Sequence, residues 1–167
     1  MRSNRSSCTV LASSIVLALV CVTPVSAQKA ILLVRHGDKM DNSSDAELSD
    51  AGRARATHLA GLLRDSGITT IYTTDFKRTR DTAKPLAEAL KISPVIVSRE
   101  PQAVVDRLRL LSAGDAALVV AHSDTLPEIL KRLGYPEPVS IADQEYDNLF
   151  VVVPMKEGPP AVLRLRY

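Results

Sequence analysis

Short aliphatic runs alternate with longer amphipathic segments from Gln28 onwards, and this alternation restricts the fold more than any other feature. Strands separated by helices usually pair in parallel through right-handed crossovers. The last two runs have only a turn region between them, which predicts an antiparallel C-terminal edge. We therefore expect an α/β fold, a three-layer sandwich in which helices flank a mostly parallel central sheet. The predicted strands are residues 30–34, 68–73, 95–97, 116–121, 149–153 and 161–165.

Four segments between these runs have helical patterns. Ser49 is placed to cap the first helix, and Pro85 should remove one backbone hydrogen bond from the second and kink it. Thr125 and Glu128 have the spacing of a capping box, which predicts the start of the fourth. The predicted helices cover about residues 49–66, 76–90 and 102–111, and a segment from 125 onwards.

The first 27 residues have the three parts of a secretory signal peptide. Arg2 and Arg5 supply a basic start, residues 10–22 a mostly apolar middle, and residues 25–27 a small-residue cleavage site. An uncleaved anchor is the alternative, which the short, interrupted apolar segment disfavours. The sequence thus predicts a signal peptide, residues 1–27, and one exported domain, residues 28–167, that is periplasmic or secreted and has no stable membrane insertion.

Composition narrows the chemistry of this exported domain. Cys8 and Cys21 both lie in the predicted signal peptide, so the domain would contain neither a disulfide nor a thiol ligand. Without the signal peptide, basic and acidic residues are equal in number, which gives no sign of nucleic-acid binding. No two histidines are three or four residues apart, so no metal site is expected.

Side chains suited to phosphate follow three of the predicted strands. Arg35 and His36 follow the first, Arg78 follows the second near a helix start, and His122 follows the fourth. Because the carboxyl ends of parallel strands share one edge of a sheet, these groups can converge on one small anion. Guanidinium groups match phosphate oxygens, and a neutral imidazole can act as nucleophile or proton carrier.

Four ordered segments resemble the histidine phosphatase superfamily, which includes cofactor-dependent phosphoglycerate mutases and phosphohistidine phosphatases. The segments are Arg35-His36-Gly37, residues 48–56, residues 72–83 and residues 120–123. The resemblance implies that His36 is the nucleophile and becomes a phosphohistidine that water hydrolyses. It also implies that Arg35, Arg78 and His122 surround the phosphoryl oxygens, and it implies no cofactor and no metal.

The proton donor is where this sequence departs from the mutase pattern. Relatives usually place a Glu in an insertion after the third strand, and this chain is short there. Glu100 is the nearest candidate, and Asp38 and Asp124, beside the two histidines, are the alternatives. Asn42 stands where many relatives carry a phosphate-contacting Asn, and Ser123 follows the second histidine, so both are expected to bind substrate.

Other polar residues have simpler interpretations. His58 lies inside an amphipathic helix and is interpreted as a surface or packing residue, and Arg53 and Arg55 as a solvated helix face. Arg80 could reach the phosphate pocket or pair with Asp81 at the surface.

The resemblance predicts a metal-independent phosphatase that hydrolyses phosphomonoesters or phosphoramidates. Its partner would be a small phosphorylated substrate or a phosphoprotein. A non-catalytic phosphate-binding module is the alternative from another class, although a pure anion binder would need the arginines and not both histidines. A phosphomutase is less favoured, because this compact chain has little room for loops that would close over a retained phosphorylated intermediate.

Overall fold

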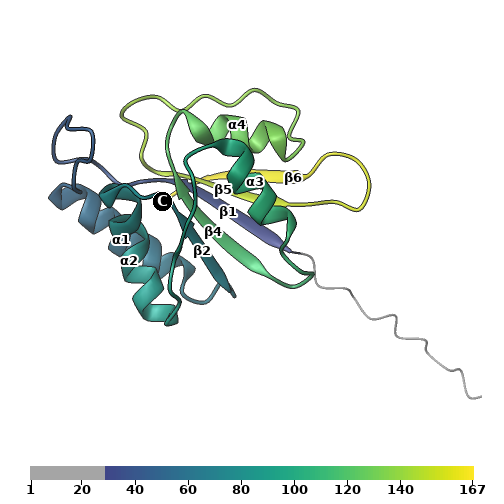
Figure 1. Cartoon of the computed structure of the whole chain (residues 1–167), viewed down its shortest axis with the longest axis horizontal. Helices are drawn as coiled ribbons and strands as arrows, with labels where there is room; N and C mark the ends of the chain where they lie inside the picture. Colours follow the sequence, from purple (N-terminus) through teal and green to yellow (C-terminus); the bar gives the residue numbers. More distant parts are fainter. Residues whose placement is uncertain (1–28) are drawn as a thin grey trace, which may run out of the picture.

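The computed structural model describes residues 29–167 as one six-stranded sheet with helices on both faces (Figure 1). The predicted signal peptide, residues 1–27, lies outside the described residues. The strands are β1 (Ala30–Arg35), β2 (Thr70–Thr73), β3 (Val95–Ile96), β4 (Ala116–Ala121), β5 (Asn148–Val153) and β6 (Ala161–Arg166). The helices are α1 (Asp50–Leu63), α2 (Lys77–Leu90), α3 (Pro101–Arg109) and α4 (Thr125–Arg132). Within the described range, no helix is long and apolar enough to cross a membrane.

The sheet has the order β3-β2-β4-β1-β5-β6. Its first four strands are parallel, and β5 and β6 pair antiparallel. Leu33 of β1 thus lies between Val119 of β4 in parallel register and Phe150 of β5 in antiparallel register. This arrangement confirms the predicted α/β fold with its antiparallel C-terminal edge.

Two hydrophobic cores lie on opposite faces of the sheet. Leu33 and its neighbours pack against α3 and α4, through residues such as Leu108 and Ile129. Leu32 and its neighbours pack against α1 and α2, through residues such as Leu59 and Leu86. Figure 1 shows the two helix pairs on the two faces. Because β1 and β4 are buried on both faces, their sequences are continuous aliphatic runs instead of alternating ones.

Two of the helices can be compared with the predictions made for Ser49 and Pro85. Ser49 caps α1 as predicted, since its hydroxyl accepts a hydrogen bond from the backbone N–H of Gly52 at 3.1 Å. The second helix passes through Pro85 and continues to Leu90 as one helix.

The predicted capping box of the fourth helix is wrong. Asp124 occupies the capping position of α4, and its side chain makes no capping hydrogen bond. The hydroxyl of Thr125 instead accepts a hydrogen bond from the backbone N–H of His122 at 3.2 Å. The hydroxyl of Thr125 therefore stabilises the turn after β4 instead of capping the helix, although α4 does begin at Thr125, as predicted.

Two glycines let the end of β1 contact the start of α1 directly. A Cβ at Gly52 would lie 2.2 Å from the backbone oxygen of Asp38, and one at Gly37 would lie 2.9 Å from the backbone oxygen of Gly52. The backbone N–H of Ser49 also donates to the oxygen of Asp38 at 2.9 Å. The segment that follows His36 is therefore held against the first turn of α1.

We expect the variant Gly52→Ala to lose about 2 kcal/mol or more of its free energy of unfolding, because the clashing atoms are backbone and cannot move aside. Gly61→Ala, in the same helix, is the matched control, since a Cβ there meets nothing within 4 Å. That control should be neutral or stabilised by up to about 1 kcal/mol. Urea denaturation measures both, and equal stability of the two variants would contradict the close contact.

Candidate active site

The predicted site residues lie in three segments that follow β1, β2 and β4, at the carboxyl edge of the parallel strands. His36 follows β1, Arg78 lies in the first turn of α2, and His122 follows β4; all three are buried. The backbone N–H of His36 donates to the backbone oxygen of Ala121 at 3.0 Å, which joins the segment after β1 to the end of β4. The two imidazole rings meet edge to face, with centroids 5.4 Å apart. The structure therefore brings together residues that are up to 86 positions apart in sequence, His36 and His122.

His36 is held as one tautomer. Its Nδ1 lies 2.8 Å from the backbone oxygen of Gly37. A carbonyl oxygen can only accept, so Nδ1 carries the hydrogen and Nε2 keeps its lone pair. Burial lowers the pKa of His36 to about 4; the charges of Arg78 and Arg35 add to this effect, and the hydrogen bond to Gly37 opposes it. The ring is therefore neutral near pH 7, with a lone pair suited to nucleophilic attack.

His122 is also held neutral. Burial, together with the neighbouring His36, Arg78, Arg99 and Arg35, lowers its pKa to about 3. Its Nε2 lies 3.2 Å from the hydroxyl of Thr74. Binding of an anion would oppose these positive charges and favour the protonated ring.

Arg35 connects the site to the loop that precedes β5. Its Nη1 donates to the backbone oxygens of Ala142 and Asp143 at 2.9 Å and of Glu145 at 3.1 Å. The ring of Tyr146 lies 4.0 Å from the guanidinium carbon. The Nε of Arg35 is buried and has no partner within residues 29–167. One side of the guanidinium thus holds the loop, and the other retains an unpaired donor.

Arg78 has a similar arrangement. Its Nη1 donates to the backbone oxygen of Ser44 at 2.9 Å, the ring of Phe76 lies 4.1 Å from its guanidinium carbon, and its Nε is buried without a partner in the described part of the chain. A buried unpaired donor costs about 1–3 kcal/mol. Two such donors beside two neutral imidazoles favour a small anion with several oxygens, such as a phosphoryl group.

None of the three candidate proton donors forms a hydrogen bond with His36 or His122. Glu100 is exposed at the start of α3, and its side chain makes no capping hydrogen bond. Asp38 pairs with Arg55 at 2.7 Å. Asp124 pairs with Arg99, and the charges of both act on the pKa of Arg78.

The secondary substrate candidates lie at the edge of the site. Asn42 is exposed in the loop that contains Ser44, and Ser123 is half-buried between His122 and α4. Neither side chain forms a hydrogen bond within residues 29–167. Both remain predictions.

Three other polar residues can now be placed. The prediction that Arg55 is solvated is wrong, because its side chain and that of Asp38 are only about a quarter exposed (26% and 25%) in their ion pair. Arg80 is exposed on α2 and forms no ion pair with any described residue. His58 is exposed, and its ring is parallel to that of Tyr167.

Several residues of the site were not predicted from the sequence. Thr74 and Thr79 lie inside the segment 72–83 that carries the resemblance, so a signal was present for them. The sequence contained no signal for Tyr146 and Arg99, because each lies outside the four segments. Each is brought next to the site by the path of a loop.

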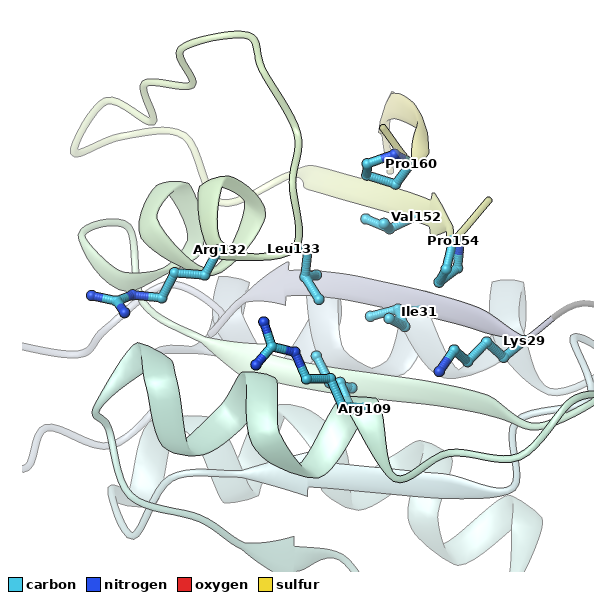
Figure 2. A pocket seen from close by; sticks show the side chains of 9 residues that line it. Lys29, Ile31, Arg109, Arg132, Leu133, Val152, Pro154 and Pro160 are labelled. Atoms are coloured by element: carbon cyan, nitrogen blue, oxygen red, sulfur yellow. The ribbon is translucent and has the colours of Figure 1, made fainter. Parts of the chain in front are cut away.

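A cavity of about 150 Å³ lies near the amino end of β1 and is lined partly by Ile31, Val152 and Arg109. Figure 2 shows its lining side chains, from β1, β5 and the helices α3 and α4. The cavity is distinct from the candidate site, because His36 follows the opposite, carboxyl end of β1.

The two imidazoles and two arginines at the carboxyl edge of this mixed sheet are the arrangement that the resemblance to the histidine phosphatases implies. The model of the histidine phosphatase superfamily (branch 1) matches residues 31–102. The probable phosphoglycerate mutase GpmB of Klebsiella pneumoniae is 34% identical over 105 residues, which cover 59% of this chain and 44% of that protein. GpmB of Erwinia tasmaniensis is 36% identical over 76 residues, which cover 41% of this chain and 35% of that protein. The chain thus spans less than half the length of these curated relatives.

Solved structures agree on the fold. The protein histidine phosphatase SixA, complexed with tungstate, has a TM-score of 0.69 at 18% identity, covering 82% of this chain and 96% of that one. A mycobacterial glucosyl-3-phosphoglycerate phosphatase, complexed with VO3, has a TM-score of 0.66 at 13% identity, covering 84% of this chain and 99% of that one. In sequence this chain is thus similar to members of the histidine phosphatase superfamily, and in fold to the solved structures.

The buried neutral imidazoles predict that acid destabilises the fold. In the unfolded chain both rings take up a proton near pH 6.5, whereas in the folded chain they stay neutral down to about pH 4 and about pH 3. The unfolded state therefore binds more protons below pH 6.5, and the free energy of unfolding should fall as the pH drops from 6.5 to about 4.

Urea denaturation across this pH window measures the effect. Carboxylates also titrate at its acid end, so the wild type is compared with the double variant His36→Gln, His122→Gln. The double variant should have the shallower dependence on pH. Equal slopes would show that the two rings are not held neutral.

Proposed function

We propose that this protein is a phosphatase that hydrolyses phosphomonoesters or phosphoramidates through a phosphohistidine at Nε2 of His36. One observation carries the proposal: the hydrogen bond from Nδ1 to Gly37 leaves the lone pair on Nε2, beside two buried arginines with unpaired donors. The similar proteins named above are phosphatases and a probable mutase, which supports an enzyme. Residues 1–27 support export to the periplasm or outside the cell.

The proposed reaction has two displacements. Nε2 of His36 attacks phosphorus, and the bond to the leaving group breaks as that group takes the electron pair and a proton. Water then attacks the phosphohistidine and gives a proton to the carboxylate that protonated the leaving group, while the N–P bond breaks and its electron pair returns to Nε2 as phosphate leaves. Arg35, Arg78 and a protonated His122 would stabilise the phosphoryl oxygens in both steps. The bond from Nδ1–H to Gly37 would stabilise the positive charge that develops on the ring.

Asp124 is the candidate proton donor next to His122 in sequence, although it too is exposed and engaged in an ion pair, with Arg99. It lies two residues after His122, and its charge acts on Arg78. Asp38 is engaged by Arg55, and Glu100 is exposed with no contact to either imidazole.

The short connection between β3 and α3 supports a phosphatase over a mutase. Residues 97–100 are all that separate the two elements, so no insertion is present there to close over the site. A mutase must retain its phosphoenzyme until the substrate has reoriented, and exposure to water works against this.

Phosphate release from a panel of compounds tests the proposal. The full-length protein is assayed with p-nitrophenyl phosphate, 3-phosphoglycerate, a sugar phosphate and a phosphohistidine peptide, with EDTA present. We expect release of inorganic phosphate that EDTA does not reduce. Binding of vanadate without release from any compound would favour the binding module, and isomerisation of 3-phosphoglycerate without release would favour a mutase.

A further inference from the structure

A chain of buried hydroxyl groups leads from His122 to the backbone. The Oγ1 of Thr74 lies 3.2 Å from Nε2 of His122 and 2.9 Å from Oγ1 of Thr79. The Oγ1 of Thr79 lies 2.8 Å from the backbone oxygen of Phe76 and 3.1 Å from that of Thr74. The exposed fractions are 3% for His122, 2% for Thr74 and 0% for Thr79, so water does not compete for these groups.

The backbone carbonyl at the end of this series of hydrogen bonds sets the direction of all of them. A carbonyl oxygen can only accept, and each hydroxyl has one hydrogen. Thr79 therefore donates to the backbone carbonyls of Phe76 and Thr74 and must accept from the hydroxyl of Thr74. The hydrogen of Thr74 is then committed to Thr79, so Thr74 can only accept from Nε2–H of His122. The reverse direction would leave the two oxygens of the 2.8 Å contact without a hydrogen between them, in an interior where that is costly.

We propose that Thr74 and Thr79 are positioning residues that hold His122 as the Nε2–H tautomer, so that Nδ1 is the ring nitrogen that takes up and releases a proton. The catalytic part of this proposal rests on the proposed phosphatase function. The tautomer is a property of the free protein and is tested without any assay of activity.

The two histidines would then have opposite tautomers. His36 carries its hydrogen on Nδ1, held by the carbonyl of Gly37, and His122 carries its hydrogen on Nε2, held by the hydroxyl of Thr74. One ring presents Nε2 as a nucleophile, and the other presents Nδ1 as a base. The nucleophile and the base therefore depend on different hydrogen-bond partners, Gly37 after β1 and Thr74 after β2.

This arrangement lets His122 change its charge without moving. When Nδ1 takes up a proton, Nε2–H keeps its bond to Thr74, and the ring orientation is preserved. The groups that act on the charge of His122 are His36 after β1, Arg78 on α2, Arg99 before α3 and Arg35 at the end of β1, none of which carries negative charge. A bound phosphoryl group supplies the missing negative charge, so proton uptake at Nδ1 accompanies binding.

Nitrogen NMR of the histidine rings tests the tautomer directly. The chain has three histidines, so full-length protein labelled with ¹⁵N-histidine gives three ring systems. The variants His36→Gln and His58→Gln assign them by loss of signals. Long-range proton–nitrogen spectra at neutral pH should show Nε2 of His122 protonated and Nδ1 bare. A protonated Nδ1 in the wild type would overturn the proposal.

The variant Thr79→Val tests the role of the hydroxyl chain. Valine has nearly the same shape but cannot accept the hydrogen of Thr74, which should turn to Nε2 of His122 and switch that ring to its Nδ1–H form. Thr79→Ser keeps the hydroxyl and should restore the wild-type spectrum. An unchanged tautomer in Thr79→Val would overturn the role of Thr79, whereas Thr74→Val tests the contact with His122 by the same spectrum.

Kinetics with p-nitrophenyl phosphate test the catalytic part. We expect kcat of Thr79→Val to fall about tenfold or more. The change in KM should be smaller, because the arginines are intact, and Thr79→Ser should recover kcat. A switched tautomer with unchanged kcat would overturn the catalytic part of the proposal. A wild type that releases no phosphate but has the expected tautomer would instead contradict the proposed function.

Discussion

The variant His36→Asn is expected to lose phosphate release by a factor of about 10³ or more, because it removes the only protein atom proposed to form a bond to phosphorus. Asparagine is the sharpest replacement. Its amide nitrogen can take the place of Nδ1 and donate to Gly37, whereas nothing takes the place of Nε2. The turn after β1 should therefore keep its structure. Release of inorganic phosphate from p-nitrophenyl phosphate measures the loss.

Trapping of the phosphoenzyme makes this test specific. Wild-type protein quenched during turnover of a ³²P-labelled substrate should hold label that is stable in alkali and labile in acid, as expected of a phosphohistidine. His36→Asn should hold none. His58→Asn, at an exposed position on α1, is the control and should behave as the wild type. Substantial turnover by His36→Asn, or label in that variant, would contradict the proposed nucleophile.

The variant Arg78→Met should change activity and stability in opposite directions. We expect kcat/KM to fall by a factor of about 10² to 10³, because a transferring phosphoryl group is stabilised mainly by fixed positive charge. Arg78 is only 9% exposed, and its described hydrogen bond goes to a backbone carbonyl, with no carboxylate as partner. Methionine fills a similar volume without a buried charge, so the free energy of unfolding should be unchanged or rise by about 1 kcal/mol.

Arg80→Met is the matched control for this experiment. Arg80 lies two residues further along α2 and is exposed. We expect its replacement to change neither kcat/KM nor the denaturation midpoint appreciably. A marked loss of stability in Arg78→Met would show that its guanidinium supports the fold, and retained activity would exclude it from the phosphate site.

Much of the framework follows from the sequence because it depends on buried strands. The run from Ala30 to Val34 is aliphatic at every position, as a strand covered on both faces requires, and it ends directly before the polar Arg35 and His36. The same pattern before His122 places both histidines at one edge of the sheet. The convergence of the two histidines could therefore be predicted from these two strands alone.

Other features depend on competition between groups that only the folded chain brings together. Thr125 had the spacing of a capping residue, but the turn after β4 placed the N–H of His122 within reach of its hydroxyl. Arg55 had the periodicity of an exposed position, but α1 begins so close to the end of β1 that Asp38 comes within reach. Spacing along the sequence carries no information about either contact.

The loop of residues 142–145 contacts Arg35 through backbone oxygens only. Every amino acid has that oxygen, so the contact constrains the path of the loop and leaves its side chains free with respect to Arg35. Natural variants and designed libraries should therefore tolerate many substitutions at Ala142 and Asp143, both of which are exposed, but few insertions or deletions. The rim of the site beside Arg35 can in this way acquire new side chains, and with them new substrate preferences, while the guanidinium stays in place.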